Sequence, residues 1–149
     1  MIRPAKKTDK EFIINAQIHM ALETENFELD RAIVSKGVEK VLENKALGIY
    51  YVFELENEVV ACLLTINEWS DWRNSFCLWI HSLYVSPNQR GKKIFKKMYQ
   101  FLQNKVSKSE DYFGLRLYVD KTNTKAIDVY NGLGMSNEHY ELFEWTADS

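Results

Sequence analysis

The chain has 149 residues, of which 46% are hydrophobic, and its formal net charge is −2. This length and composition predict one globular domain over residues 1–149 with a sizeable core. The slightly negative charge argues against a general nucleic-acid binder, and no apolar run approaches the ~18 residues that a membrane span needs.

The first half of the chain predicts a strand, two helices and then an antiparallel meander of three strands. A short strand at 1–5 leads into a helix that Thr8 or Asp9 caps and that ends before a loop at 23–27. A second helix follows at 30–44. The three strands of the meander are expected at 47–54, 59–66 and 76–85.

The connection at 67–75 is expected to be a loop, and it carries two tryptophans among charged residues. Trp69 and Trp72 stand beside two acidic residues and an arginine. Exposed aromatic residues next to charges often line a binding site, whereas tryptophans also anchor loops against a core. The sequence leaves both interpretations open.

A change of hydrophobic period marks the most informative stretch, residues 76–102. The apolar run at 76–85 is typical of a buried strand, and Pro87 ends it because proline lacks an N–H donor. One helix face is then outlined by Ile94, Met98, Phe101 and Leu102. A strand, a tight turn and a helix leave several free backbone N–H groups at one helix N-terminus, which favours an anion.

Five basic residues accompany this helix N-terminus: Arg90, Lys92, Lys93, Lys96 and Lys97. They predict a phosphate-bearing ligand, although a basic helix is also typical of a plain solvated face. The chain contains neither G-x-x-x-x-G-K-[ST] nor G-x-G-x-x-G, so neither of these two common phosphate-binding motifs is present.

The remaining chain alternates strands and a helix. The expected elements are a polar turn at 107–112, a strand at 114–119, a helix at 123–131, a tight turn at 132–135 and a final strand at 141–145. Strands and helices in this order predict the α+β class, with helices on both sides of a mixed sheet.

Two short segments resemble motifs of the GNAT N-acetyltransferase family. Residues 90–95, Arg-Gly-Lys-Lys-Ile-Phe, resemble the R/Q-x-x-G-x-G/A turn with which that family grips the pyrophosphate of acyl-CoA. Lys93 and Phe95 replace its two small residues, and Gly91 and the charge of Lys93 are expected to compensate in part. Residues 120–135 resemble N-x-x-A-x-x-x-Y-x-x-x-G-F, with the matches Asn123, Ala126, Tyr130 and Gly134, and Met135 for the aromatic residue.

The resemblance covers essentially the whole chain, because the order of elements also agrees. It implies a GNAT-type mixed, mostly antiparallel sheet flanked by helices on both faces, with a cleft between 78–85 and 114–119. It also implies acetyl-CoA as acyl donor, whose pantetheine arm pairs with strand backbone as an added strand would. The expected cofactor-binding residues are Leu83, Tyr84, Val85, Arg90, Gly91, Lys92, Lys93, Ile94, Phe95, Lys96, Asn123 and Tyr130.

Tyr130 and His81 are the expected catalytic residues. By resemblance Tyr130 sits beside the thioester sulfur, where a phenol can protonate the leaving thiolate, and the alternative is a core tyrosine. His81 stands where some family members carry a glutamate, alternating with Trp79 and Leu83 on one strand face. A neutral imidazole can accept a proton near pH 7, and the alternative is a histidine that only lines the pocket.

The acceptor is expected to be the amine of a small molecule or, as a second choice, of a peptide. Acidic residues would attract a cationic amine, and aromatic residues would contact its body. The expected substrate-binding residues are Glu23, Glu25, Phe27, Glu68, Trp69, Asp71, Trp72 and Trp79. The sequence does not fix the oligomeric state, although apolar residues in the last strand could pair across a homodimer.

Cysteine usage predicts a cytoplasmic protein. Cys62 and Cys77 lie in apolar strands and are expected to be two buried thiols, and no Cys or His cluster suggests a metal site. The predicted function is direct transfer of an acetyl group from acetyl-CoA to an amine. The alternative is an inactive module of the same fold that binds acyl-CoA or a protein, and nucleic acid is not an expected partner.

Overall fold

The structure is a computed structural model that describes residues 1–147. Its strands are β1 (Ile2–Pro4), β2 (Ile49–Leu55), β3 (Glu58–Ser70), β4 (Ser75–Val85) and β5 (Tyr112–Leu117). Its helices are η1 (Lys7–Asp9), α1 (Lys10–Glu25), α2 (Arg31–Glu43), η2 (Pro87–Gln89), α3 (Ile94–Ser107) and α4 (Thr124–Gly132), where η marks a 3-10 helix.

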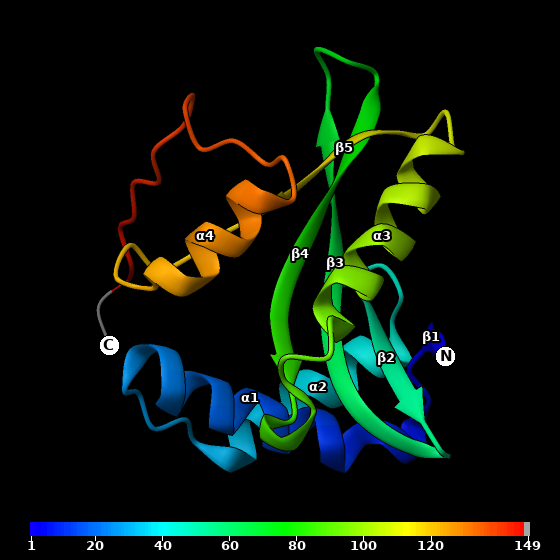
Figure 1. Ribbon diagram of the computed structural model, residues 1–149, viewed down its shortest axis with the longest axis vertical. Coiled ribbons are helices and arrows are strands. Elements are labelled where there is room, and N and C mark those ends of the chain that lie inside the picture. The colour runs from blue at the N-terminus through cyan, green and yellow to red at the C-terminus, as the bar shows by residue number, and fades with distance from the viewer. Residues whose placement is uncertain (148–149) are drawn as a thin grey trace.

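The strands form one sheet in the order β1-β2-β3-β4-β5 (Figure 1). Neighbours pair antiparallel from β1 to β4, and only β4 and β5 run parallel. The predicted α+β class with a mixed, mostly antiparallel sheet is therefore confirmed.

Helices cover both faces of this sheet, as predicted. Alternation along β2 divides the core, because Tyr50 and Val52 pack with α1 and α2, whereas Tyr51 and Phe53 pack with α3. Met98 of α3 is fully buried on its side, so truncation to alanine is expected to cost about 2 to 5 kcal/mol.

The first strand is tied to the first helix by one buried carboxylate. Asp9 accepts hydrogen bonds from the Lys6 backbone N–H at 2.7 Å and from the Arg3 guanidinium at 2.8 Å. Burial by itself would raise the pKa of Asp9, but these bonds outweigh it and hold the pKa below the ordinary value. Asp9 precedes α1 as predicted, although its carboxylate bonds to the Lys6 N–H and not to an N–H of the helix.

Helix α1 continues into the segment predicted as a loop at 23–27. The Thr24 hydroxyl donates to the Met20 carbonyl at 2.8 Å, so this residue stays within the helix. Asn26 then adopts a left-handed conformation with φ 50° and closes the helix. The prediction for 23–25 was wrong because local polarity does not break a helix that already packs on the sheet.

The predicted loop at 67–75 is mostly strand. Pairing continues through Trp69 with Phe76 and Ser70 with Ser75, so only 71–74 form the turn. The Trp69 and Phe76 rings stack edge to face at 5.0 Å, a cross-strand pair that favours extension of the hairpin. Trp69 therefore serves the hairpin as a packing residue.

The final strand predicted at 141–145 is absent, since residues 136–147 contain no helix or strand. A strand needs a partner for its backbone groups, and within residues 1–147 none pairs with this segment. The apolar pattern was identified correctly, but the pairing that it requires is not made within the described chain.

Both cysteines are free and buried, as predicted. Burial raises the pKa of the Cys62 thiol to about 12 and raises that of Cys77 as well. Among residues 1–147, no helix combines the length and the apolar character needed to cross a membrane.

Candidate active site

A β-bulge in β4 sets up the site. Cys62 pairs with Tyr84 and Leu64 with His81, so two residues of β4, Ser82 and Leu83, lie opposite one residue of β3. Ser82 absorbs the extra residue with φ 54°, a left-handed conformation that is uncommon for serine. Nothing in the sequence marks this position.

The bulge reverses the side-chain alternation of β4. Leu83 packs with the α3 side of the sheet, together with Ile80, whereas Tyr84 packs with the α1 side. The expectation that His81 and Leu83 share one face is therefore wrong. The reversal thus places Leu83 on the same face of β4 as Ile80, and His81 on the opposite face.

Strands β4 and β5 separate beyond the bulge. Their pairing ends at Ile80 with Leu117, while β4 continues to Val85 without a partner on that side among the described residues. The predicted strand at 114–119 is accordingly shifted to Tyr112–Leu117. The parallel strands thus leave backbone of β4 open to a ligand, at the place that the motif resemblance indicated.

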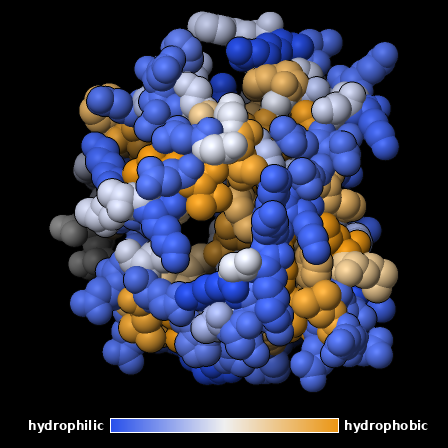
Figure 2. Space-filling model, viewed as in Figure 1, coloured by the Kyte–Doolittle hydropathy of each residue, from blue (hydrophilic) through white to orange (hydrophobic). Residues whose placement is uncertain are grey.

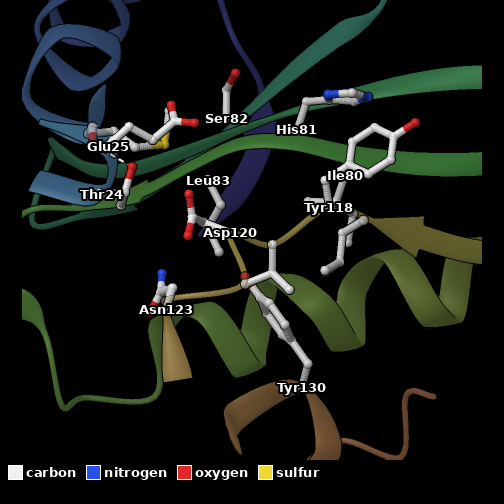
Figure 3. Close-up of a pocket in the computed structure, with 13 residues that line it drawn as sticks. Thr24, Glu25, Ile80, His81, Ser82, Leu83, Tyr118, Asp120, Asn123 and Tyr130 are labelled. Carbon is white, nitrogen blue, oxygen red and sulfur yellow. Dashed lines mark hydrogen bonds between the residues drawn. The ribbon is translucent and has the colours of Figure 1, made fainter. Parts of the chain in front are cut away.

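Two adjoining hollows occupy this gap, and Figure 2 shows an opening with apolar walls between α1 and α4. The His81 hollow, of about 250 Å³, is lined by Met20, Thr24, Glu25, Ile80, His81, Ser82, Leu83, Leu117, Tyr118, Val119, Asp120, Asn123 and Tyr130 (Figure 3). The Arg90 hollow, of about 240 Å³, is lined by Met20, Glu23, Thr24, Leu83, Tyr84, Val85 and Arg90. The two hollows adjoin, because both are lined by Met20, Thr24 and Leu83.

The Arg90 hollow ends at the turn before α3, whose N-terminus is open. Lys93 is the N-cap residue and makes no side-chain cap hydrogen bond, so the first N–H groups of α3 lack an intrahelical or capping partner. Gly91 has φ 82°, and a Cβ built there meets no atom within 4 Å. Lys92 and Lys96 are exposed beside this turn, while Ile94 is buried and fixes the helix in the core.

Arg90 is held in place by two contacts. Its Nε donates to the Val85 carbonyl at 2.9 Å, and its Nη2 pairs with Glu23 at 2.8 Å. Glu23, expected at the acceptor site, therefore belongs to the basic end of the cleft. Glu23 lines the Arg90 hollow and not the His81 hollow.

The two departures from the GNAT turn have separate structural consequences. Lys93 adopts the left-handed conformation with φ 61°, which glycine would adopt without strain. The Phe95 ring lies edge to face with that of Tyr130, with the ring centroids 5.7 Å apart. Lys93 makes no side-chain cap hydrogen bond at the N-terminus of α3, and the aromatic contact positions the ring of Tyr130.

Tyr130 and Asn123 enter the cleft from α4. Tyr130 extends from the helix into the His81 hollow (Figure 3), and burial raises the pKa of its phenol above the ordinary value. The phenol therefore stays protonated near neutral pH and can donate a hydrogen bond or a proton. The Asn123 oxygen caps α4 by accepting the Ala126 N–H at 3.1 Å, which leaves the side-chain NH₂ able to donate to a ligand.

His81 belongs to an aromatic cluster on β4 and β5. Its ring lies 6.1 Å from that of Trp79 and 6.0 Å from that of Tyr118, and the latter two rings are 4.5 Å apart. Burial lowers the pKa of His81 from its ordinary value, so the imidazole is neutral at pH 7 and can accept a proton. The Trp79 Nε1 is buried without a hydrogen-bond partner among the described residues.

Acidic residues accompany this cluster. Glu25 reaches the His81 hollow from the end of α1, and Asp120 does so after β5. Hydrogen bonds from the Thr122 side chain and backbone hold the pKa of Asp120 below its ordinary value, so this carboxylate is ionised at neutral pH. Sequence reasoning missed Tyr118, which lies within the strand predicted at 114–119, and Asp120, which directly follows that strand.

The other residues expected at the acceptor site lie outside both hollows. Glu68 pairs with Arg116 at 3.3 Å, and Phe27 is exposed beyond α1. Trp69, Asp71 and Trp72 lie at the far end of the β3–β4 hairpin, where Phe76, the partner of Trp69, is roughly 17 Å from His81 at the rise of a strand. Of the eight predicted acceptor residues, Glu25 lines the His81 hollow, and Trp79 contacts it through His81 and Tyr118.

No group of three or more potential metal ligands occurs among residues 1–147.

Comparison with known proteins assigns this cleft to a family. The sequence matches the acetyltransferase (GNAT) family over residues 15–135. The chain belongs to this family. It is an N-acetyltransferase, and the fold and motif resemblance predicted from the sequence are confirmed. No curated protein matches the chain in sequence.

Solved structures agree with the assignment. A possible acetyltransferase from Clostridium difficile 630 is 37% identical, with TM-score 0.94, and covers 100% of this chain and 98% of its own. A predicted acetyltransferase from Clostridium acetobutylicum, solved with acetyl-CoA, is 18% identical, with TM-score 0.74 and coverage of 97% and 95%. An aminoglycoside acetyltransferase from an uncultured soil sample, in complex with sisomicin, is 21% identical, with TM-score 0.76 and coverage of 99% and 96%. The last two neighbours share the fold.

Proposed function

We propose that this acetyltransferase domain transfers an acetyl group from acetyl-CoA directly to the primary amine of a small molecule or a peptide. The observation that carries the proposal is a pair of adjoining hollows. One reaches Arg90, just before the open N-terminus of α3, and the other contains Tyr130 and His81.

The donor end fits the chemistry of acyl-CoA. The free N–H groups of α3 suit a pyrophosphate, and Lys92, Lys93 and Lys96 add positive charge. Beyond Ile80 the β4 backbone has no β5 partner, and at Leu83 it suits the amides of the pantetheine arm, whereas the Val85 carbonyl already accepts from Arg90. The Asn123 amide would orient the arm toward Tyr130. When bound, acetyl-CoA supplies the acetyl group as an activated thioester.

Two side chains carry the proton transfers in this proposal. His81, neutral at pH 7, accepts a proton from the attacking amine, directly or through a water molecule. Tyr130, protonated because burial raises its pKa, donates a proton or a hydrogen bond to the departing thiolate sulfur. One proton is thus accepted and one is donated, so the charge of the site is balanced over the reaction.

The two buried cysteines support transfer without a covalent enzyme intermediate. Cys62 is fully buried, with a pKa of about 12, and Cys77 is fully buried as well. A thiol of this kind is a poor nucleophile. Free buried thiols also support the proposal that the enzyme works in the cytoplasm, where cysteines stay reduced.

The acceptor end favours a cationic amine. Glu25 and Asp120 bring negative charge to the His81 hollow, and the Trp79–Tyr118 pair offers aromatic surface for a cation or an apolar body. The amine attacks only in its neutral form, so these groups would bind the cation before His81 takes up its proton. Small diamines and polyamines satisfy this pattern, as does a peptide N-terminus.

The second candidate is a binding module that has lost catalysis. Its support is Lys93 and Phe95 in the GNAT turn and His81 in place of a glutamate. Coenzyme A release, measured with acetyl-CoA and a panel of amines, separates the two functions. If the protein is an enzyme, we expect turnover that Tyr130→Phe lowers about 100-fold, whereas binding of acetyl-CoA without turnover of any amine would support the module.

A further inference from the structure

An ion pair joins α1 to the turn before α3 and has no part in the reaction proposed above. The Arg90 Nη2 lies 2.8 Å from the Glu23 Oε2, although 67 positions separate the two residues in the chain. Both side chains line the Arg90 hollow, and they are the only charged ones among the described residues that line it. The hollow expected to hold an anionic donor therefore has a lining without net charge.

Arg90 does not need Glu23 to keep its position. Its Nε donates to the Val85 carbonyl at 2.9 Å, and its guanidinium lies 5.5 Å from the centre of the Tyr84 ring. This charge-assisted hydrogen bond and this cation–π contact both persist when Glu23 is removed. Glu23 thus occupies one N–H group of Arg90 without being required to orient the side chain.

The ion pair is exposed enough for another anion to replace the carboxylate. The side chains of Arg90 and Glu23 keep 45% and 42% of their surface accessible to solvent. An exposed pair of this kind contributes little net stability, because water and salt screen it and two long side chains lose freedom when it forms. A diphosphate carries more charge than one carboxylate, and its oxygens match the fork of a guanidinium, so it is the stronger partner.

The turn before α3 brings such an anion to this ion pair. Arg90 directly precedes Gly91, and the open N-terminus of α3 follows at Lys93. An anion held by the first N–H groups of α3 is therefore expected beside the Arg90 guanidinium and the Glu23 carboxylate. Arg90 attracts the anion, whereas Glu23 repels it and occupies the N–H group that it needs.

We propose that Glu23 competes with the diphosphate of the acyl donor for Arg90, and that it thereby limits the affinity for acetyl-CoA and for the product coenzyme A. This inference rests on the proposed function, because it takes acyl-CoA as the donor. Glu23 acts through Arg90 and is a positioning residue. Since most affinity differences between related complexes lie in the dissociation rate, its main effect is faster release of coenzyme A.

The first test compares Glu23→Gln with the wild type by calorimetry. Loss of the carboxylate frees the Arg90 Nη2 and removes the repulsion of phosphate, so acetyl-CoA and coenzyme A should bind about three- to tenfold more tightly. Glu11→Gln is the matched control, because Glu11 lies on the same helix, also pairs with an arginine, at 3.0 Å, and lines neither hollow. It should change either Kd less than about twofold.

The second test separates competition for Arg90 from a general change of charge or shape. ADP should gain affinity from Glu23→Gln as acetyl-CoA does, whereas acetyl-pantetheine, which has no diphosphate, should not. In an Arg90→Gln background, Glu23→Gln should change the Kd for acetyl-CoA less than about twofold, because no guanidinium remains to be freed. Stopped-flow measurements should show coenzyme A dissociating more slowly from Glu23→Gln than from the wild type.

The outcomes distinguish this proposal from the proposed function. If the wild type binds acetyl-CoA and Glu23→Gln binds it no more tightly, the competition is refuted and the proposed function stands. A gain that persists undiminished in the Arg90→Gln background, or that appears equally with acetyl-pantetheine, would also overturn the competition. Absence of acetyl-CoA binding in the wild type and in both variants would contradict the proposed function itself.

Discussion

The two hollows of the cleft differ both in charge and in construction. The Arg90 hollow leads to backbone N–H groups and to lysines, and its shape depends on left-handed residues in the turn before α3. The His81 hollow is built from side chains, three of them aromatic, with Glu25 and Asp120 beside them. Leu83 lies at their junction.

This difference explains how one cleft can take two substrates of opposite charge. An anionic phosphate is attracted to the basic end and repelled by the acidic end, and the reverse holds for a protonated amine. The reacting groups then meet between the two hollows, at the residues that can move protons. The variants below test each end against the other.

Tyr130→Phe should have the largest effect. Loss of the phenolic proton is expected to lower kcat about 100-fold, because the thiolate would leave without a proton donor. The Kd for acetyl-CoA should change less than about threefold, since the ring and its contact with Phe95 remain. Tyr99→Phe, another tyrosine whose pKa is raised by burial, is the control in steady-state kinetics. Equal losses in kcat and affinity would argue against an acid role.

His81→Gln should come next, with about a 10- to 100-fold loss in kcat/KM near pH 7. Burial lowers the pKa of His81, so the wild type keeps its base until pH falls below the ordinary value of 6.5 and loses activity through the lowered pKa. A profile of kcat/KM against pH, from acid to neutral, should show this loss of activity at low pH in the wild type and not in the variant. If the two profiles are identical, the loss at low pH comes from protonation of the amine substrate.

Gly91→Ala tests the basic end alone. With φ 82°, an alanine is strained there, and a distorted turn should weaken acetyl-CoA binding about tenfold. Gly37→Ala is the matched control, because that helical glycine has an ordinary φ and no atom within 4 Å of an added Cβ. Calorimetry with acetyl-CoA measures both, and unchanged binding by Gly91→Ala would show that the turn does not contact the phosphates.

The smallest effect is expected at Lys93, as a difference in folding stability between two variants. Lys93→Gly and Lys93→Ala lose the same charge, but only glycine accepts φ 61° without strain. The glycine variant should therefore be about 1 kcal/mol more stable toward denaturant. Equal stabilities would mean that this turn relaxes at no cost.

The basic end was predictable because its geometry follows from local sequence. Pro87 ends a strand, Ile94 and Met98 set a helix period, and the GNAT turn lies between them. The acceptor end was not predictable from the sequence, because its lining depends on the register in which β4 pairs with β3 and β5. The bulge at Ser82 and the shortened β5 decide which residues enter the His81 hollow, and neither has a sequence signal.

Residues 141–145 teach a related point about strands. They have the composition of a strand, yet they form none among the described residues. Composition determines whether a segment can pair, whereas the partner is set by tertiary or quaternary contacts. Similarly, Trp69 and Trp72 were expected near the substrate because the hairpin was taken for a loop.

Calorimetric titration with acetyl-CoA tests the central claim most directly, with acetyl-pantetheine and ADP as the two halves of the donor. If the open N-terminus of α3 and the unpaired backbone of β4 act together, acetyl-CoA should bind at micromolar Kd. Either half alone should bind at least about tenfold more weakly, a difference of ~1.4 kcal/mol. No binding of acetyl-CoA, or equal binding of ADP, would contradict the account.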